Sequence, residues 1–140
     1  MVVIRDATPA DADAVAGLLT QLGYAVLPEE IPGRLERLSR GGVRTLLAVR
    51  DGEILGLATM HIIGVLNRAR DVAWLTALVV DAASRGAGVG RRLVAEVEAR
   101  ARESGCERLS VTTYESLHGA RAFYQRVGLQ ETGRRFGKAL

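Results

Sequence analysis

The chain has 140 residues, of which 48% are hydrophobic, with 16 glycines, one cysteine and a formal net charge of +3. This length suits one domain with a core of its own, so residues 1–140 are expected to form a single domain. A lone cysteine excludes a disulfide framework, and no apolar run approaches the roughly 20 residues of a membrane span. The first residues lack a signal-peptide pattern, so a soluble, cytoplasmic protein without a membrane partner is expected.

The basic residues are unevenly distributed along the chain. Residues 1–80 carry 8 basic and 9 acidic side chains, whereas residues 81–140 carry 11 and 7. All the basic residues except Lys138 are arginines, which make bidentate contacts with phosphates and carboxylates. The excess indicates either an anionic ligand of the second half or only a solvated surface. Nucleic acid is not an expected partner, because acidic residues interrupt the basic ones and aromatic residues are scarce.

The first third of the chain predicts one strand and two helices. Residues 2–5 are expected to form the strand, and Thr8-Pro9-Ala10-Asp11 is typical of a helix start. The next apolar residues recur on one helical face, which ends at Gly23: Val15, Leu18, Leu19 and Leu22. A weaker helix is expected over residues 29–40.

Strand signals dominate the middle of the chain. Residues 44–50 and 53–63 flank Asp51-Gly52, which predicts a hairpin, and residues 71–81 have the composition of a strand buried on both faces. The remaining predicted elements are a helix over residues 89–103, a strand over 107–113, a helix over 117–127 and one or two closing strands over 129–139.

Two features of this order predict the fold class. The strand–helix–strand stretch 71–113 implies a parallel pair joined by a crossover, whereas the hairpin at Asp51-Gly52 implies antiparallel neighbours. An α/β fold is therefore expected, with a mixed, mostly antiparallel sheet flanked by helices on both faces.

The glycine-rich stretch Ser84–Arg92 lies between a predicted buried strand and a predicted helix. Glycines there let backbone N–H groups approach an anion, and a helix N-terminus adds unpaired donors. The stretch fails the dinucleotide fingerprint, because Arg91 occupies the third glycine position, and Gly90-Arg91-Arg92 is not a P-loop ending. A tight structural turn between strand and helix is the alternative interpretation.

Arg85-x-x-Gly88-x-Gly90 resembles the Q/R-x-x-G-x-G/A signature of the GCN5-related N-acetyltransferase (GNAT) superfamily. The preceding Leu78-Val79-Val80-Asp81 and the later Ala120–Leu129, with its Phe-Tyr pair, resemble the same family, as does the order of elements. The chain is identified as a small single-domain member, and the resemblance spans essentially its whole length.

The resemblance implies that acetyl-CoA is the co-substrate and that the strands at 71–81 and 107–113 splay apart to hold the thioester. Tyr124 matches the family's general acid, and a backbone N–H near Leu78 or Val79 would stabilise the oxyanion. The residues expected to pair with pantetheine or to hold the pyrophosphate are Leu78, Val79, Val80, Arg85, Gly86, Ala87, Gly88, Val89, Gly90 and Arg91.

The implied reaction is acetyl transfer to a primary amine of a small molecule or peptide, by direct attack in a ternary complex. The chain departs from the family at the strand acid, where it has Thr76 and Ala77, and at an asparagine position, where it has Leu117. A non-catalytic acyl-CoA-binding or sensor module is therefore the alternative. A homodimer, common in the family, stays open.

Three side chains are candidates for the missing base: His61, Glu115 and His118. No metal is expected, because the two histidines lack further ligands. Cys106 is expected to be a buried structural thiol, and Trp74 either joins the core or lines the acceptor site. In the family, the region of Tyr24 and of helix 29–40 walls the acceptor pocket.

The chain also resembles aminoalkylphosphonate and related small-molecule acetyltransferases. The resemblance lies in Met60-His61, in Gly105-Cys106 and in the tail Arg135–Leu140. The absent strand acid argues against transferring their substrate to this chain.

Overall fold

The computed structural model describes residues 1–113 and 119–140. Within them, five strands form one sheet in the order β1-β2-β3-β4-β5. The strands are β1 (Val3–Asp6), β2 (Val43–Arg50), β3 (Glu53–Ile63), β4 (Val72–Val80) and β5 (Arg108–Val111). The helices are α1 (Ala12–Leu22), α2 (Ile31–Arg40), α3 (Val89–Glu103) and α4 (Ala120–Arg126). Short 3-10 turns at Pro9–Asp11, Pro28–Glu30 and Ala82–Ser84 precede α1, α2 and the glycine-rich loop.

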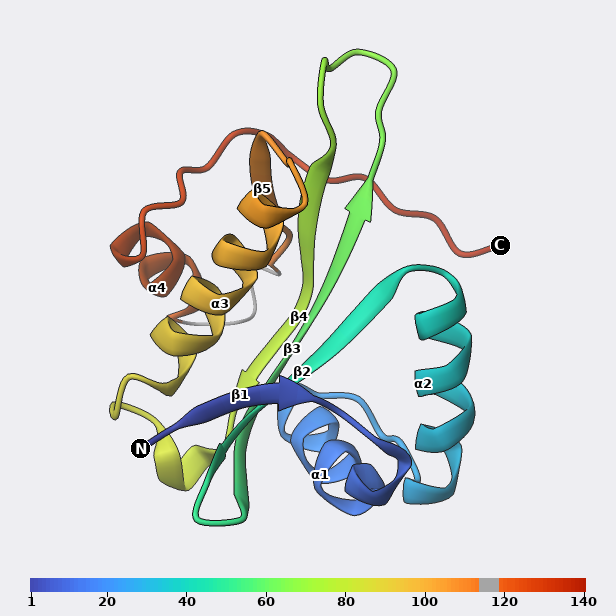
Figure 1. Cartoon of the computed structure of the whole chain (residues 1–140), viewed down its shortest axis with the longest axis vertical. Coiled ribbons are helices and arrows are strands. Elements are labelled where there is room, and N and C mark those ends of the chain that lie inside the picture. Colours follow the sequence, from blue (N-terminus) through green and yellow to red (C-terminus); the bar gives the residue numbers. More distant parts are fainter. Residues whose placement is uncertain (114–118) are drawn as a thin grey trace.

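The sheet is mixed, as the sequence predicted. Strands β1 to β4 pair antiparallel with their neighbours, and β4 and β5 pair parallel. Helix α3 is the crossover between the two parallel strands. Helices α1 and α2 cover one face of the sheet, and α3 and α4 cover the other (Figure 1).

Each face of the sheet has its own apolar core. Alternate side chains of a strand point to opposite faces, so neighbours such as Leu57 and Ala58 enter different cores. The core beneath α3 includes Leu93 and Val97, both fully buried, and the core beneath α1 and α2 includes Ile31 at 1% exposure. The central strands are therefore apolar on both sides.

Local signals in the sequence explain several element ends. Asp51 and Gly52 have φ of 51° and 79°, the two left-handed residues of the tight hairpin between β2 and β3. Gly23 ends α1 with φ of 111°. The Asp11 carboxylate accepts a hydrogen bond of 2.8 Å from the Thr8 N–H, as expected for a capping acid.

The predicted closing strands over residues 129–139 are wrong. The chain from Val127 to Leu140 has no strand, and Phe136 is 94% exposed. Gly133 and Gly137 flank two arginines here, and Thr132 is the only β-branched residue of 129–139, so these residues have low strand propensity. The predicted helix over 117–127 is shorter than expected at its described end, because α4 spans Ala120–Arg126.

Candidate active site

Strand β4 pairs with β5 over only part of its length. Residues Val72–Leu75 oppose Arg108–Val111, whereas pairing with β3 continues to Val80. Thr59 of β3 opposes Ala77 and Met60 opposes Leu75, which leaves Thr76 as the extra residue of a β-bulge. Bulges bend a strand and increase its local twist. The two parallel strands therefore part beyond Leu75, and the second half of β4 has a partner on one edge only.

The backbone groups of Leu78 and Val80 face the gap between β4 and β5. The Asp81 N–H donates to the Leu55 carbonyl of β3 at 2.8 Å. Backbone groups alternate along a strand, so those of Val79 also face β3, while those of Leu78 and Val80 point the other way. The Arg85 Nε agrees with this, because it donates to the Val80 carbonyl at 3.2 Å.

The turn after β4 is anchored by α1. The Gln21 Nε2 donates to an Asp81 carboxylate oxygen at 2.8 Å, and its Oε1 accepts from the Ala82 N–H at 2.9 Å. The other Asp81 oxygen accepts from the Ala83 N–H at 3.1 Å. Gln21 therefore fixes the start of the glycine-rich loop. This role of Gln21 could not be predicted from the sequence, because no local pattern relates a helical glutamine to a turn 60 residues later.

The loop enters α3 through two glycines that need left-handed backbone. Gly86 and Gly88 have φ of 82° and 83°, and a Cβ on either would meet no atom within 4 Å. Gly88 is the N-cap of the 15-residue α3, and its carbonyl accepts the Arg92 N–H at 3.0 Å. The preceding N–H groups of the first turn have no partner within the helix. This open cradle fits a phosphate-bearing group.

Gly90 has a different role from the other two glycines. A Cβ there would lie 3.2 Å from Cζ of Phe123 and 3.5 Å from Cγ2 of Val80. The missing side chain lets α4 pack against the first turn of α3. Phe123 thereby positions the adjacent Tyr124, whose ring it meets edge-on at a centroid distance of 5.5 Å.

The three arginines in and next to the loop, Arg85, Arg91 and Arg92, differ in their contacts. Arg85 bonds the end of β4, as described above, and Arg92 donates to the Val2 carbonyl at 3.1 Å, away from the loop. Arg91 is exposed and makes no ion pair with any described residue. Arg92 is therefore tied to the chain just before β1 and not to the loop.

Tyr124 lines a groove of about 1660 Å³ that runs along β5 and the gap. Its phenol is largely buried, and this burial raises its pKa to about 12. Trp74, Thr76 and Tyr24 line the same groove. Trp74 was expected either in the core or at the acceptor site, and Tyr24 in the region that walls the acceptor pocket; both line this groove, and an acceptor-binding role for either stays a prediction.

A family model for the acetyltransferase (GNAT) family matches residues 15–129. The chain belongs to the GNAT family. The matched region includes the glycine-rich loop, β4 and Tyr124. The sequence resemblance to the family is thus confirmed.

The full-length relatives of this GNAT chain are N-acetyltransferases. Aminoalkylphosphonate N-acetyltransferase of Salmonella typhimurium is 32% identical over 139 residues, which cover 98% of this chain and 90% of the relative. Aminoglycoside N(6')-acetyltransferase type 1 of Stenotrophomonas maltophilia is 33% identical over 141 residues, with 94% and 88% covered. The crystal structure of an acetyltransferase from Trypanosoma brucei superimposes with a TM-score of 0.86 at 25% identity, over the whole of both chains.

In place of the strand acid that the family resemblance implies, this chain has Thr76, the bulge residue, and Ala77. Of the three candidate bases, only His61 can be placed: it is half-buried on β3, with its imidazole 3.9 Å from where a Cβ of Gly42 would lie. Glu115, His118 and the asparagine-equivalent Leu117 lie outside the described residues. Among the described residues, no group of three or more His, Cys, Asp or Glu side chains could hold a metal ion.

The Cys106 thiol lines the groove but has no sign of activation. Burial, and then the charge of Asp71, raise the pKa of this thiol, so it stays protonated at neutral pH. Its N–H donates to the Ala101 carbonyl at 2.9 Å, which closes the last turn of α3. Cys106 is half-buried rather than buried as expected, and a structural role for its thiol stays a prediction.

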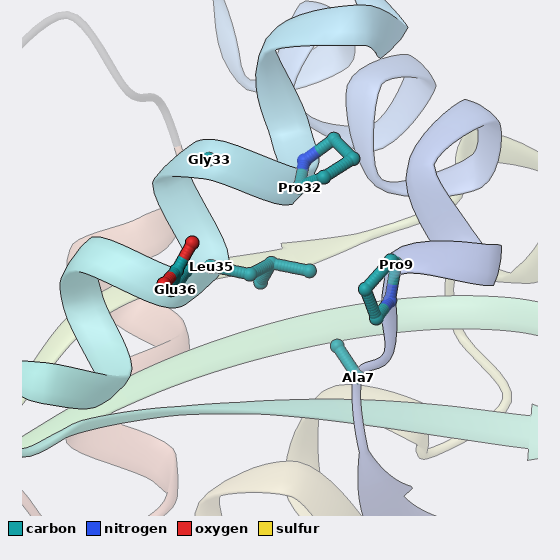
Figure 2. A pocket seen from close by; sticks show the side chains of 6 residues that line it. All are labelled: Ala7, Pro9, Pro32, Gly33, Leu35 and Glu36. Carbon is teal, nitrogen blue, oxygen red and sulfur yellow. The ribbon is translucent and has the colours of Figure 1, made fainter.

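A second hollow of about 440 Å³ lies on the other side of the molecule, between α2 and the turn before α1 (Figure 2). Its lining is Ala7, Pro9, Pro32, Gly33, Leu35 and Glu36. Leu35 points toward Pro9 and Ala7, while the Glu36 carboxylate lies at the margin (Figure 2). One exposed carboxylate among apolar groups offers no acid–base pair, so the groove beside Tyr124 is the candidate active site. In the parts of the chain that the structure describes, no helix is long and apolar enough to cross a bilayer.

Proposed function

We propose that this GNAT protein transfers the acetyl group of acetyl-CoA to a primary amine of a small molecule, by direct attack within a ternary complex. The observation that carries the proposal is the adjacency of three parts: an open glycine cradle at the N-terminus of α3, the unpaired edge of β4, and Tyr124, whose neighbour Phe123 meets Gly90 of α3 beside Val80 of β4. The names of the two full-length relatives, which act on aminoalkylphosphonates and aminoglycosides, favour a small polar amine as acceptor.

The chain's residues divide the binding of acetyl-CoA between them. The loop Arg85–Gly90 would hold the pyrophosphate on its backbone amides, with the Arg91 guanidinium beside it. Leu78 and Val80 would pair with the pantetheine arm, because their backbone groups face the gap, whereas those of Val79 serve the ladder to β3. Val79 would contribute its buried side chain to the floor instead, at 5% exposure.

The same backbone also offers a stabilising group for the reaction. The Leu78 N–H points into the gap, so it is our candidate for the donor to the developing oxyanion of the thioester carbonyl. This narrows the earlier choice between Leu78 and Val79 to one residue. A fixed backbone donor in a partly water-excluded gap contributes typically about 3–4 kcal/mol of transition-state stabilisation.

Tyr124 is the proposed general acid. The neutral amine forms a C–N bond to the carbonyl carbon, the C–S bond breaks, and the departing sulfur takes the Tyr124 proton. The proton that the amine nitrogen loses passes to solvent, and solvent reprotonates the phenolate. A pKa of about 12 keeps Tyr124 protonated at neutral pH, so the proton is present when the sulfur leaves.

Thiol release in the presence of acetyl-CoA tests the proposal, with 2-aminoethylphosphonate and kanamycin A as the probe amines. Tyr124→Phe is expected to lower kcat by roughly 10²–10⁴-fold while leaving the dissociation constant for acetyl-CoA unchanged. Tight binding of acetyl-CoA without thiol release for either amine would instead favour the non-catalytic acyl-CoA-binding module, for which the absent strand acid argues.

A further inference from the structure

Two threonine hydroxyls meet at the bulge of β4. The Oγ1 atoms of Thr59 and Thr76 lie 2.7 Å apart, and Thr76 Oγ1 is also 3.3 Å from the Thr59 carbonyl. Thr76 is exposed and lines the groove that Tyr124 also lines. Thr76 is also one of the two positions, with Ala77, at which the family resemblance implied an acid.

Either hydroxyl can donate in the 2.7 Å contact, whereas the Thr59 carbonyl can only accept, from Thr76, in the longer contact of 3.3 Å. In both arrangements the single hydroxyl proton of Thr76 is directed to Thr59, either to its Oγ1 or to its carbonyl. At least one lone pair of Thr76 Oγ1 therefore stays available. Toward the groove, the Thr76 oxygen is consequently an uncharged acceptor that has no proton to give.

This lone pair lies on the face of the sheet opposite to the packing of Tyr124. The neighbours of Thr59 on β3, Ala58 and Met60, belong to the core beneath α3, so Thr59 and its partner Thr76 face the side of α1 and α2. Tyr124 packs against the core beneath α3. The hydroxyl groups of Thr76 and Tyr124 thus border the gap from opposite faces of the sheet.

We propose that Thr76 Oγ1 accepts a hydrogen bond from an N–H of the acceptor amine and thereby orients the amine toward the thioester, with Thr59 as the positioning residue that fixes the Thr76 rotor. This inference rests on the proposed function. An amine held from one face and a general acid on the other match the reaction, because nucleophile and leaving group occupy different sides of the carbonyl carbon.

The chemistry of a hydroxyl acceptor differs from that of a carboxylate. Thr76 does not remove the amine proton, so the amine has to arrive neutral, and the rate follows the fraction of free amine in solution. The Thr76 oxygen also disfavours a substrate group that can only accept hydrogen bonds, because a lone pair of that group would then face a lone pair of Thr76. Primary amines of low pKa are the acceptor class that such a site serves best at neutral pH.

Steady-state kinetics with 2-aminoethylphosphonate and kanamycin A test the assignment. Thr76→Val keeps the size and strand propensity of the side chain but removes the acceptor, and it is expected to lower kcat/KM for the amine roughly 5- to 15-fold. Thr76→Ser restores the hydroxyl and is expected to stay within about threefold of the wild type. Thr59→Val removes only the hydroxyl that contacts Thr76, and its expected loss is smaller, about two- to fourfold. The dissociation constant for acetyl-CoA is expected to be unchanged in all three variants.

Thr45→Val is the matched control, because Thr45 of β2 lies opposite Thr59 in the same row of the sheet but is buried and does not line the groove. It is expected to leave kcat/KM unchanged. Thr76→Glu places a titratable carboxylate at the same point and is expected to move the ascending limb of the kcat/KM profile to lower pH, an effect that a merely structural threonine would not show.

The outcomes separate the two levels of the proposal. Thiol release by the wild type with an unaffected Thr76→Val variant would overturn the assignment of Thr76 and leave the proposed function standing. The assignment of Thr76 would also be overturned by an equal loss of kcat/KM in Thr76→Ser and Thr76→Val, or by an ascending limb of the kcat/KM profile that does not move in Thr76→Glu. A wild type that releases no thiol with either amine would overturn the proposed function and this assignment with it.

Discussion

The two sides of the sheet are secured very differently. On the β1 side, the Arg5 guanidinium makes paired hydrogen bonds of 2.8 and 2.9 Å to the Asp11 carboxylate, and Arg44 bonds Asp6 of β1 at 2.9 Å. On the β5 side, pairing stops after four residues and a groove of about 1660 Å³ follows the edge. Strand β1 also pairs over four residues, but the Ala7 N–H extends its contact with β2 by donating to the Thr45 carbonyl at 2.9 Å. On the β5 edge of β4, residues 76–80 have no strand partner.

This difference separates stability from function within one sheet. Exposed strand edges invite unwanted pairing, and side-chain contacts or charges are the usual ways to protect them. The β1 edge has such protection from arginines and aspartates. The gap beside β4 keeps its backbone groups available, as recognition by strand addition requires. We expect substitutions on the two sides to affect different measurements.

The largest expected effect comes from proline at neighbouring positions of β4. Leu78→Pro removes an N–H that faces the gap, so the fold should survive while kcat falls roughly 10²–10³-fold. Val79→Pro removes an N–H that faces β3 and is expected to cost at least about 1–3 kcal/mol of unfolding free energy. Thiol-release kinetics and urea unfolding of both variants measure the contrast. Equal losses of stability in the two variants would contradict the assigned backbone directions.

Gly56→Ala tests how tightly the site side is packed. A Cβ at Gly56 would lie 3.0 Å from the Val79 carbonyl oxygen and 3.1 Å from Cδ1 of Leu93. We expect a loss of about 1–3 kcal/mol in unfolding free energy, because the Val79 carbonyl cannot give way without disturbing the pairing of β3 with β4, and the Leu93 side chain crowds the same point from α3. Weaker acetyl-CoA binding should accompany it, since α3 carries the glycine cradle.

Gly17→Ala is the matched control for this glycine. Gly17 lies on the exposed side of α1, and a Cβ there meets nothing within 4 Å. The substitution should stabilise the protein by about 0.5–1 kcal/mol, because alanine loses less backbone entropy in a helix. A neutral Gly56→Ala alongside a stabilising Gly17→Ala would show that α3 has room to move.

A smaller effect is expected on the β1 side, from Asp11→Asn. The hydrogen bonds from Arg5 and then Thr8 hold the pKa of the Asp11 carboxyl down at about 2. A lowered pKa stabilises the fold above the unfolded value of about 3.9 and loses that contribution as the pH falls toward the folded value. Because Arg5 is partly exposed, we expect Asp11→Asn to cost about 1–2 kcal/mol at pH 7 and about half as much at pH 3.

Asp6→Asn provides the comparison for Asp11. Its partner Arg44 is 48% exposed and Asp6 is 56% exposed, so loss of this ion pair should cost less than about 0.5 kcal/mol. The unfolding free energies of Asp11→Asn and Asp6→Asn, measured in urea at several pH values, check this comparison. Kinetic constants should be unaffected by either substitution. A pH-independent difference between wild type and Asp11→Asn would contradict the role of the carboxylate charge.

The sequence allowed most of the fold to be predicted, because its signals there are local. Hairpin chemistry at Asp51-Gly52, the apolar run of β4 and the glycine-rich helix start each specify their own segment. The family resemblance placed the gap between the strands at 71–81 and 107–113, but the residue at which they part could not be predicted, since the bulge at Thr76 depends on the pairing between two strands. The Gln21 anchor, the contact of Gly90 with Phe123 and the Thr59–Thr76 pair likewise join distant positions that no periodicity relates. The prediction of closing strands over residues 129–139 was wrong, because composition alone does not show whether a segment has a neighbouring strand to pair with.

The smallest expected effect is the absence of an alkaline limb in the kcat/KM profile. Burial raises the pKa of Tyr124 to about 12, so the phenol keeps its proton from about pH 6 to about pH 10.5. Over this range kcat/KM should rise with the fraction of neutral amine and then level off. Tyr124→Phe should lower the whole profile without changing its shape, because no ionisation of the phenol contributes to it. A descending limb in the wild type that disappears in Tyr124→Phe would mean that Tyr124 ionises in this range. Tyr124 would then be more open to solvent than its packing against the core beneath α3 implies.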